Sequence, residues 1–142
     1  MDEKKPKPLP KTVLIVEDDE DIGNLLMLAI TGETSHLAML VKDGFQALRW
    51  VRTKKPNLFI LDYNLPGMNG IQLYEHLHAR KDLADVPVVL VSANVPEYEV
   101  RSRNLILVRK PFELDELLEL VEEVVDKPVN IADYQSDDMK RA

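Results

Sequence analysis

The chain has 142 residues, which is the size of one domain with short tails. Hydrophobic residues make up 45% of it and charged residues 30%, a composition that predicts a packed globular core. The absence of cysteine excludes disulfides and Cys-ligated zinc, no apolar run is long enough to span a membrane, and a net charge of −7 argues against non-specific nucleic-acid binding. We therefore expect a cytoplasmic protein whose partners include neither nucleic acid nor a membrane.

Both ends of the chain differ in composition from its middle. Residues 1–11 are rich in lysine and proline and lack the apolar stretch of a signal peptide, so they are predicted to form a flexible leader. Residues 127–142 are polar and too few to form a second domain. One domain is therefore expected over residues 12–126, and no output domain is expected to follow it.

Five short apolar runs recur along the middle of the chain. They are continuous rather than alternating, which is typical of strands that are buried on both faces of a parallel sheet. The five predicted strands are residues 13–16, 37–41, 58–61, 88–91 and 105–108.

Amphipathic stretches separate these runs. Two of them place apolar residues at i, i+3, i+4 and i+7, the spacing of one helical face. They are Ile22, Leu25, Leu26 and Ala29, and then Leu114, Leu117, Leu118 and Val121. Shorter patterns predict helices around residues 47–51 and 73–77. The alternation predicts an α/β fold of (βα)5 type, with an open five-stranded parallel sheet, doubly wound by helices on both faces.

Polar residues gather where the predicted strands end. Glu17 and Asp18 follow the first strand, Asp62 the third, Ser92 the fourth and Lys110 the fifth. In the flavodoxin-like strand order 2-1-3-4-5, the first and third strands are neighbours, and ligands bind at their carboxyl ends. The acidic pair and Asp62 are therefore expected to meet at one edge of the sheet.

This set of residues suits phosphoryl transfer. Carboxylates in one cleft repel each other unless a cation lies among them, and an all-oxygen ligand set favours Mg²⁺. A lysine and a hydroxyl add the charge neutralisation that a phosphoryl group needs, and a carboxylate can act as the nucleophile. Each residue alone also has a structural interpretation, such as Asp18 or Asp19 capping a helix, but the joint position favours function.

Four motifs resemble those of the receiver domain of bacterial response regulators. They are residues 13–19 (VLIVEDD), 61–70 (LDYNLPGMNG), 91–93 (VSA) and 110–112 (KPF), and the resemblance covers about residues 12–126. It implies that Asp62 is the phosphoacceptor of a two-component phosphorelay. It also implies that Glu17 and Asp18 position Mg²⁺, that Asn64 gives the metal its backbone carbonyl, and that Asp19 starts a helix.

The resemblance also assigns the remaining site residues and the partners. It implies that the Ser92 hydroxyl moves to the phosphoryl group, that Lys110 pairs with it, and that the Lys110–Pro111 peptide bond is cis. The phosphodonor would be a histidine kinase or a histidine phosphotransfer protein. Without an output domain, the chain would act on a downstream protein target or pass its phosphoryl group onward.

Two departures from the family pattern fall on the face that members of the family use to pass the signal on. Leu107 stands where members usually have Tyr or Phe, three residues before the lysine. The stretch between Ser92 and Lys110 is short, contains Pro96 and shows little apolar periodicity, which predicts a short fourth helix. Because of these departures, an alternative function remains open: a domain of receiver fold that acts as an interaction module without phosphorylation.

A phosphatase of the haloacid dehalogenase type is the other alternative, but its nucleophile follows the first strand in an Asp-x-Asp pattern, unlike Asp62. The histidines His36, His76 and His78 lack the spacing of a metal-binding pair and are interpreted as structural or surface residues.

Overall fold

The computed structural model describes residues 9–126, so most of the expected leader and the whole expected tail lie outside the described part. Five parallel strands form one sheet in the order β2-β1-β3-β4-β5, which confirms the predicted topology. The strands are β1 (Thr12–Val16), β2 (Leu37–Val41), β3 (Leu58–Asp62), β4 (Val88–Ser92) and β5 (Ile106–Arg109). The helices are α1 (Glu20–Glu33), α2 (Gly44–Trp50), α3 (Gly70–His78), α4 (Glu97–Arg101) and α5 (Leu114–Asp126).

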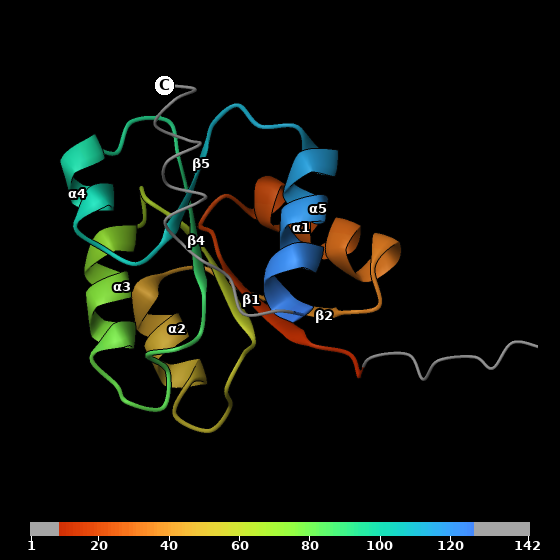
Figure 1. Ribbon diagram of the computed structural model, residues 1–142, viewed down its shortest axis with the longest axis horizontal. Helices are drawn as coiled ribbons and strands as arrows, with labels where there is room; N and C mark the ends of the chain where they lie inside the picture. Colours follow the sequence, from red (N-terminus) through yellow and green to blue (C-terminus); the bar gives the residue numbers. More distant parts are fainter. Residues whose placement is uncertain (1–8, 127–142) are drawn as a thin grey trace, which may run out of the picture.

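The sheet is the middle layer of three (Figure 1), with α1 and α5 on one face and α2, α3 and α4 on the other. Alternate residues of each central strand supply the two cores. In β1, Leu14 and Val16 pack toward α2 and α3, whereas Val13 and Ile15 pack toward α1 and α5. Every residue of β3 and β4 is buried, which is why these strands are continuous apolar runs in the sequence.

The inner face of α1 differs from the predicted face. Leu25 is 54% exposed, whereas Gly23, Leu26 and Ile30 are buried. A Cβ atom on Gly23 would lie 2.7 Å from Cδ1 of Leu40, so the helix approaches β2 through this glycine. The prediction for Leu25 was wrong because hydrophobicity alone cannot reveal that a glycine occupies the closest point of contact.

Side-chain caps fix the starts of the helices that follow β1 and β3. The carboxylate of Asp19 accepts hydrogen bonds from the backbone N–H groups of Asp21 and Ile22, at 3.0 and 3.2 Å. Asn69 and Gln72 form a reciprocal capping box at the start of α3. Asp19 is therefore the helix-start residue that the sequence predicted, and Asp18 is not the N-cap.

The fourth helix is short, as the sequence predicted. It has five residues and begins after Pro96, which makes no side-chain capping bond. Its far end is anchored to α3, because the backbone N–H of Asn104 donates to the hydroxyl oxygen of Tyr74 at 2.8 Å. Arg103 Nε also donates to Glu75 Oε2 at 2.6 Å. None of the described helices has the length and apolar character needed to cross a membrane.

The side chain of His36, which directly precedes β2, links the start of β1 to helix α5. It is buried, and its Nδ1 accepts a hydrogen bond from the backbone N–H of Lys11 at 3.1 Å. That bond places the proton on Nε2, which donates to Glu122 Oε1 of α5 at 2.8 Å. The structural interpretation of this histidine is confirmed.

We predict that His36→Ala lowers the free energy of unfolding by about 2–4 kcal/mol, since it removes a buried ring and both of its hydrogen bonds. Urea denaturation followed by circular dichroism measures this loss. His76→Ala, a change at an exposed position on α3, is the matched control and should stay within about 0.5 kcal/mol of the parent. Equal losses in the two variants would contradict the bridging role of His36.

Candidate functional site

Three carboxylates meet at the carboxyl ends of β1 and β3. Asp62 is the last residue of β3, and Glu17 follows β1; both are buried, whereas Asp18 is exposed. One carboxylate oxygen from each of the three residues lies within 4.8 Å of the others. The parallel pairing of Val16 with Leu61 aligns the two strand ends, so the register of the sheet creates this cluster.

Glu17 is the most perturbed member of the cluster. Burial raises the pKa of its carboxyl from 4.5 to about 7, and the neighbouring Asp62 carboxylate adds to the rise. A hydrogen bond from the backbone N–H of Asp19 to Glu17 Oε2, at 3.1 Å, acts in the opposite direction and lowers the pKa. The ionised form of Glu17 is therefore disfavoured in the absence of a cation, and a bound cation would stabilise it.

Lys110 supplies one positive charge to this edge. Its Nζ lies 3.1 Å from Oδ1 of Asp62, and its backbone N–H donates to the carbonyl oxygen of Ser92 at 3.0 Å. The second bond fixes the lysine backbone against the end of β4. The Lys110–Pro111 peptide bond is cis, as the resemblance implied.

Ser92, the last residue of β4, is fully buried and directs its hydroxyl toward the following loop. Its Oγ accepts hydrogen bonds from the backbone N–H groups of Asn94 and Val95, at 3.0 and 2.9 Å. The structure thus places Ser92 at the expected edge, but its hydroxyl is engaged with its own loop rather than with Asp62.

Asn64 lies at a tight turn directly after Asp62. The backbone N–H of Leu65 donates to the carbonyl oxygen of Tyr63 at 3.1 Å, which closes a three-residue turn around Asn64. The Nδ2 of Asn64 lies 3.5 Å from Oδ1 of Asn94. The sequence interpretation did not single out Asn94; its only signal is its position two residues after Ser92.

The ligand set fits a small, hard divalent cation. Glu17, Asp18 and Asp62 offer only oxygen atoms, and Asp62 already balances part of its charge against Lys110. Mg²⁺ takes few carboxylates and keeps several waters, which suits a cluster that is open to solvent on the side of Asp18. The donor set and the raised pKa of Glu17 are thus consistent with Mg²⁺ binding.

The fold and this arrangement define a receiver domain. The family model for the response regulator receiver domain matches residues 13–122, and the chain belongs to that family. The family resemblance and the flavodoxin-like fold predicted from the sequence are thereby confirmed.

Sequence relatives and solved structures agree with this family. A DNA-binding response regulator, MtrA of Mycolicibacterium smegmatis, is 36% identical over 110 residues, which are 75% of this chain and 46% of the relative. The chain spans less than half the length of the curated relatives that it matches. The receiver domain of a signal transduction histidine kinase from Syntrophus aciditrophicus superposes with a TM-score of 0.73 at 28% identity, covering 84% of this chain and 95% of that one.

A third similarity concerns a metal-bound structure. The receiver domain of the sensor histidine kinase PA1611 from Pseudomonas aeruginosa PAO1 has a TM-score of 0.71 at 23% identity, covering 83% of this chain and 99% of that one. That domain was solved with a magnesium ion coordinated in its active-site cleft. At this identity, the similarity shows the shared fold alone.

We predict that Glu17→Gln stabilises the Mg²⁺-free protein at pH 8 but not at pH 5. A folded-state pKa of about 7, against 4.5 for an ordinary glutamate, means that stability is lost as the pH rises from 4.5 to about 7, because the unfolded chain releases this proton more readily than the buried carboxyl does. Glutamine is uncharged at every pH, so the melting temperature at pH 8 should rise by roughly 5 °C.

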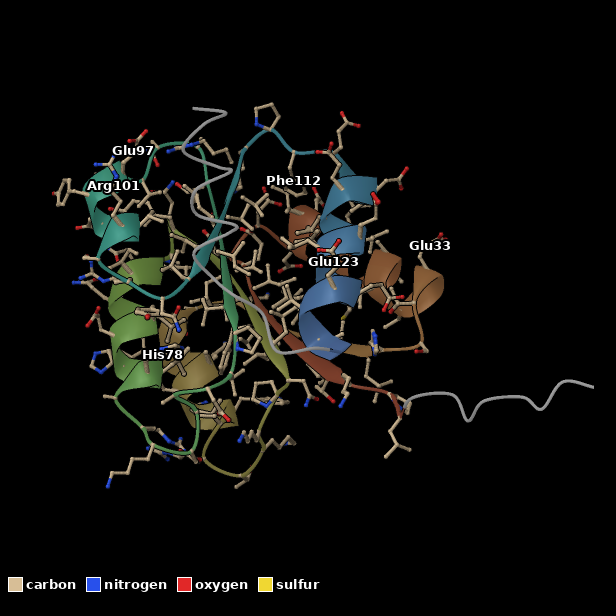
Figure 2. The ribbon with its side chains drawn as sticks, viewed as in Figure 1. Glu33, His78, Glu97, Arg101, Phe112 and Glu123 are labelled. Carbon is tan, nitrogen blue, oxygen red and sulfur yellow. The ribbon has the colours of Figure 1, made fainter. Side chains whose placement is uncertain are left out.

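The control is Glu33→Gln at the exposed end of α1 (Figure 2), which should leave the melting temperature unchanged at both pH values. Excess Mg²⁺ should remove or reverse the advantage of Glu17→Gln, because the variant loses a ligand. Identical melting curves for parent and Glu17→Gln at pH 8 would contradict the raised pKa.

Proposed function

We propose that this chain is a Mg²⁺-dependent switch that accepts a phosphoryl group on Asp62 from a histidine kinase or a histidine phosphotransfer protein. The observation that carries the proposal is the contact between Lys110 Nζ and Asp62 Oδ1 within reach of the Glu17 and Asp18 carboxylates. A buried carboxylate paired with an ammonium group, next to a cation site, combines a nucleophile with the charges that a phosphoryl group requires.

The reaction is a displacement at phosphorus. An oxygen of the Asp62 carboxylate forms a bond to phosphorus while the bond from phosphorus to the donor histidine nitrogen breaks. The electron pair of the broken bond stays on that nitrogen, and the product on Asp62 is an acyl phosphate. The Lys110 ammonium is placed to neutralise phosphoryl oxygens as they approach Asp62, where it already lies 3.1 Å from Oδ1.

Mg²⁺ would be held by the carboxylates of Glu17, Asp18 and Asp62 together with the backbone carbonyl of Asn64. When bound, it offsets the negative charge that these groups and the phosphoryl oxygens bring together. The Pseudomonas receiver domain, which shares this fold, holds a magnesium ion in its active-site cleft. The tight turn around Asn64 supports the assignment, because the turn fixes the backbone next to Asp62.

Ser92 is the proposed link between the site and the rest of the domain. If its hydroxyl turned to a phosphoryl group on Asp62, the backbone N–H groups of Asn94 and Val95 would lose their acceptor. The loop that leads into α4 would then rearrange. Leu107 is buried in the core and has no ring to rotate, so residues 93–104 are the proposed switch segment.

We infer that the described residues act through protein partners: the phosphodonor and a downstream target. Curated relatives include DNA-binding response regulators such as MtrA, and this chain matches only part of their length. The phosphorylation-independent module remains the second candidate, because Leu107 and the five-residue α4 depart from the family pattern. The charge cluster at Asp62 favours the phosphorylated switch, since an unused cluster of repelling carboxylates only destabilises a fold.

We predict that the protein gains the mass of one phosphoryl group when it is mixed with acetyl phosphate and Mg²⁺. Asp62→Asn should abolish the gain, because an amide cannot act as the nucleophile, while circular dichroism shows an intact fold. Asp115→Asn on the exposed face of α5 is the matched control and should be phosphorylated like the parent. Intact-mass spectrometry measures both, and a mass gain that persists in Asp62→Asn would place the acceptor elsewhere.

We also predict that Mg²⁺ and beryllofluoride, a phosphoryl mimic, change amide hydrogen exchange mainly within residues 93–104. Ser92→Ala should show fast exchange at Asn94 and Val95 before the addition and little further change after it, since the acceptor is missing from the start. Ser35→Ala, which removes an exposed hydroxyl outside this segment, should behave like the parent. A response confined to α5 would rule out this segment as the switch.

A further inference from the structure

The loop that carries Asn64 is contacted at its tip by the start of α2. A Cβ atom on Gly67 would lie 2.8 Å from Cε2 of Phe45, so the phenyl ring rests directly on the backbone of Gly67. The next residue, Met68, packs against Gly44 in the same way. Two successive residues of α2 therefore face two successive residues of the β3–α3 loop. Figure 1 shows α2 and α3 as neighbours on one face of the sheet.

The position of Phe45 is not explained by packing in a hydrophobic core. Its side chain is 55% exposed, and it does not belong to either hydrophobic core. Gly67 has a φ of 81°, a left-handed conformation that favours glycine, so the loop places at its tip a residue without a side chain. The ring occupies the space that a side chain at residue 67 would take.

The base of the same loop is closed by hydrogen bonds. The backbone N–H of Gly70 donates to the carbonyl oxygen of Tyr63 at 2.8 Å, and that of Leu65 donates to the same oxygen at 3.1 Å. Asn64 lies inside the turn that the Leu65 bond closes, and its side chain is exposed. Its backbone is thus held on one side by these bonds and leads on the other side to the contact between Gly67 and Phe45.

We propose that Phe45 is a positioning residue for the metal site: its ring holds the loop at Gly67 and thereby orients the Asn64 carbonyl toward the cation. This inference rests on the proposed function, because it assumes that Glu17, Asp18, Asp62 and Asn64 hold Mg²⁺. Phe45 would act through Gly67 and not as a ligand of the metal. Groups that orient metal ligands are commonly worth about tenfold in metal affinity.

The test is a calorimetric titration of EDTA-treated protein with Mg²⁺. Phe45→Ala should raise the dissociation constant for Mg²⁺ about tenfold. Phe45→Tyr keeps the ring at an exposed position and should restore the parent value. Leu28→Ala removes a comparably exposed apolar side chain from α1 and should leave the affinity unchanged. Urea denaturation without metal should show parent-like stability for Phe45→Ala, which separates positioning from loss of fold.

The Mg²⁺ dependence of phosphorylation by acetyl phosphate gives a second readout. The half-saturating Mg²⁺ concentration should rise in Phe45→Ala, whereas the rate at saturating Mg²⁺ should approach that of the parent. Parent-like Mg²⁺ binding in Phe45→Ala would overturn the proposal, and a loss restricted to phosphorylation by a donor protein would assign Phe45 to docking instead. If the parent itself binds no Mg²⁺ and gains no phosphoryl mass, the proposed function fails rather than the role of Phe45.

Discussion

Negative charge at the carboxyl edge of the sheet is the constraint on which the rest of the structure depends. Glu17 and Asp62 are buried there, and Asp18 brings a third carboxylate within 4.8 Å. Lys110 balances one of these charges, while burial, together with the neighbouring carboxylates, raises the pKa of Glu17 to about 7. Without a metal, the ionised carboxylates destabilise the folded state. Binding of a cation, or of a proton by Glu17, removes part of this repulsion.

The surrounding fold keeps these charges together despite their repulsion. Parallel pairing of β1 with β3 sets the distance between the two strand ends, and the backbone bond from Lys110 to Ser92 brings the end of β5 to β4. The helices that follow β1 and β3 begin at the caps Asp19 and Asn69, and Glu17 accepts one backbone hydrogen bond from Asp19. The paired strands and the capped helices thus hold the carboxylates side by side at this edge.

Much of this architecture is readable from the sequence, because its causes are local. Continuous apolar runs give the strands, and the residues directly after them give the candidate site. Contacts between distant segments are not readable in this way. The exposure of Leu25 depends on how Gly23 meets Leu40, and the ring of Phe45 on Gly67 joins the start of α2 to the β3–α3 loop, which no sequence pattern reveals. The direction of the Ser92 hydroxyl likewise requires coordinates, since either orientation is compatible with a serine at the end of β4.

The hydrogen bond from Asn104 to Tyr74 gives the α4 segment a fixed far end, which acts as a pivot. If the proposed switch moves the loop after Ser92, the displacement within α4 is expected to be largest at its start, where Glu97 lies. The Glu97 carboxylate is 3.0 Å from Arg101 of its own helix and 3.8 Å from Arg109 of β5, and Figure 2 shows Glu97 and Arg101 on the outer side of α4. Rotation about the pivot changes the distance to Arg109 far more than the distance to Arg101. In the proposed switch, one carboxylate shared between two guanidinium groups would therefore couple the orientation of α4 to the charge distribution on this surface.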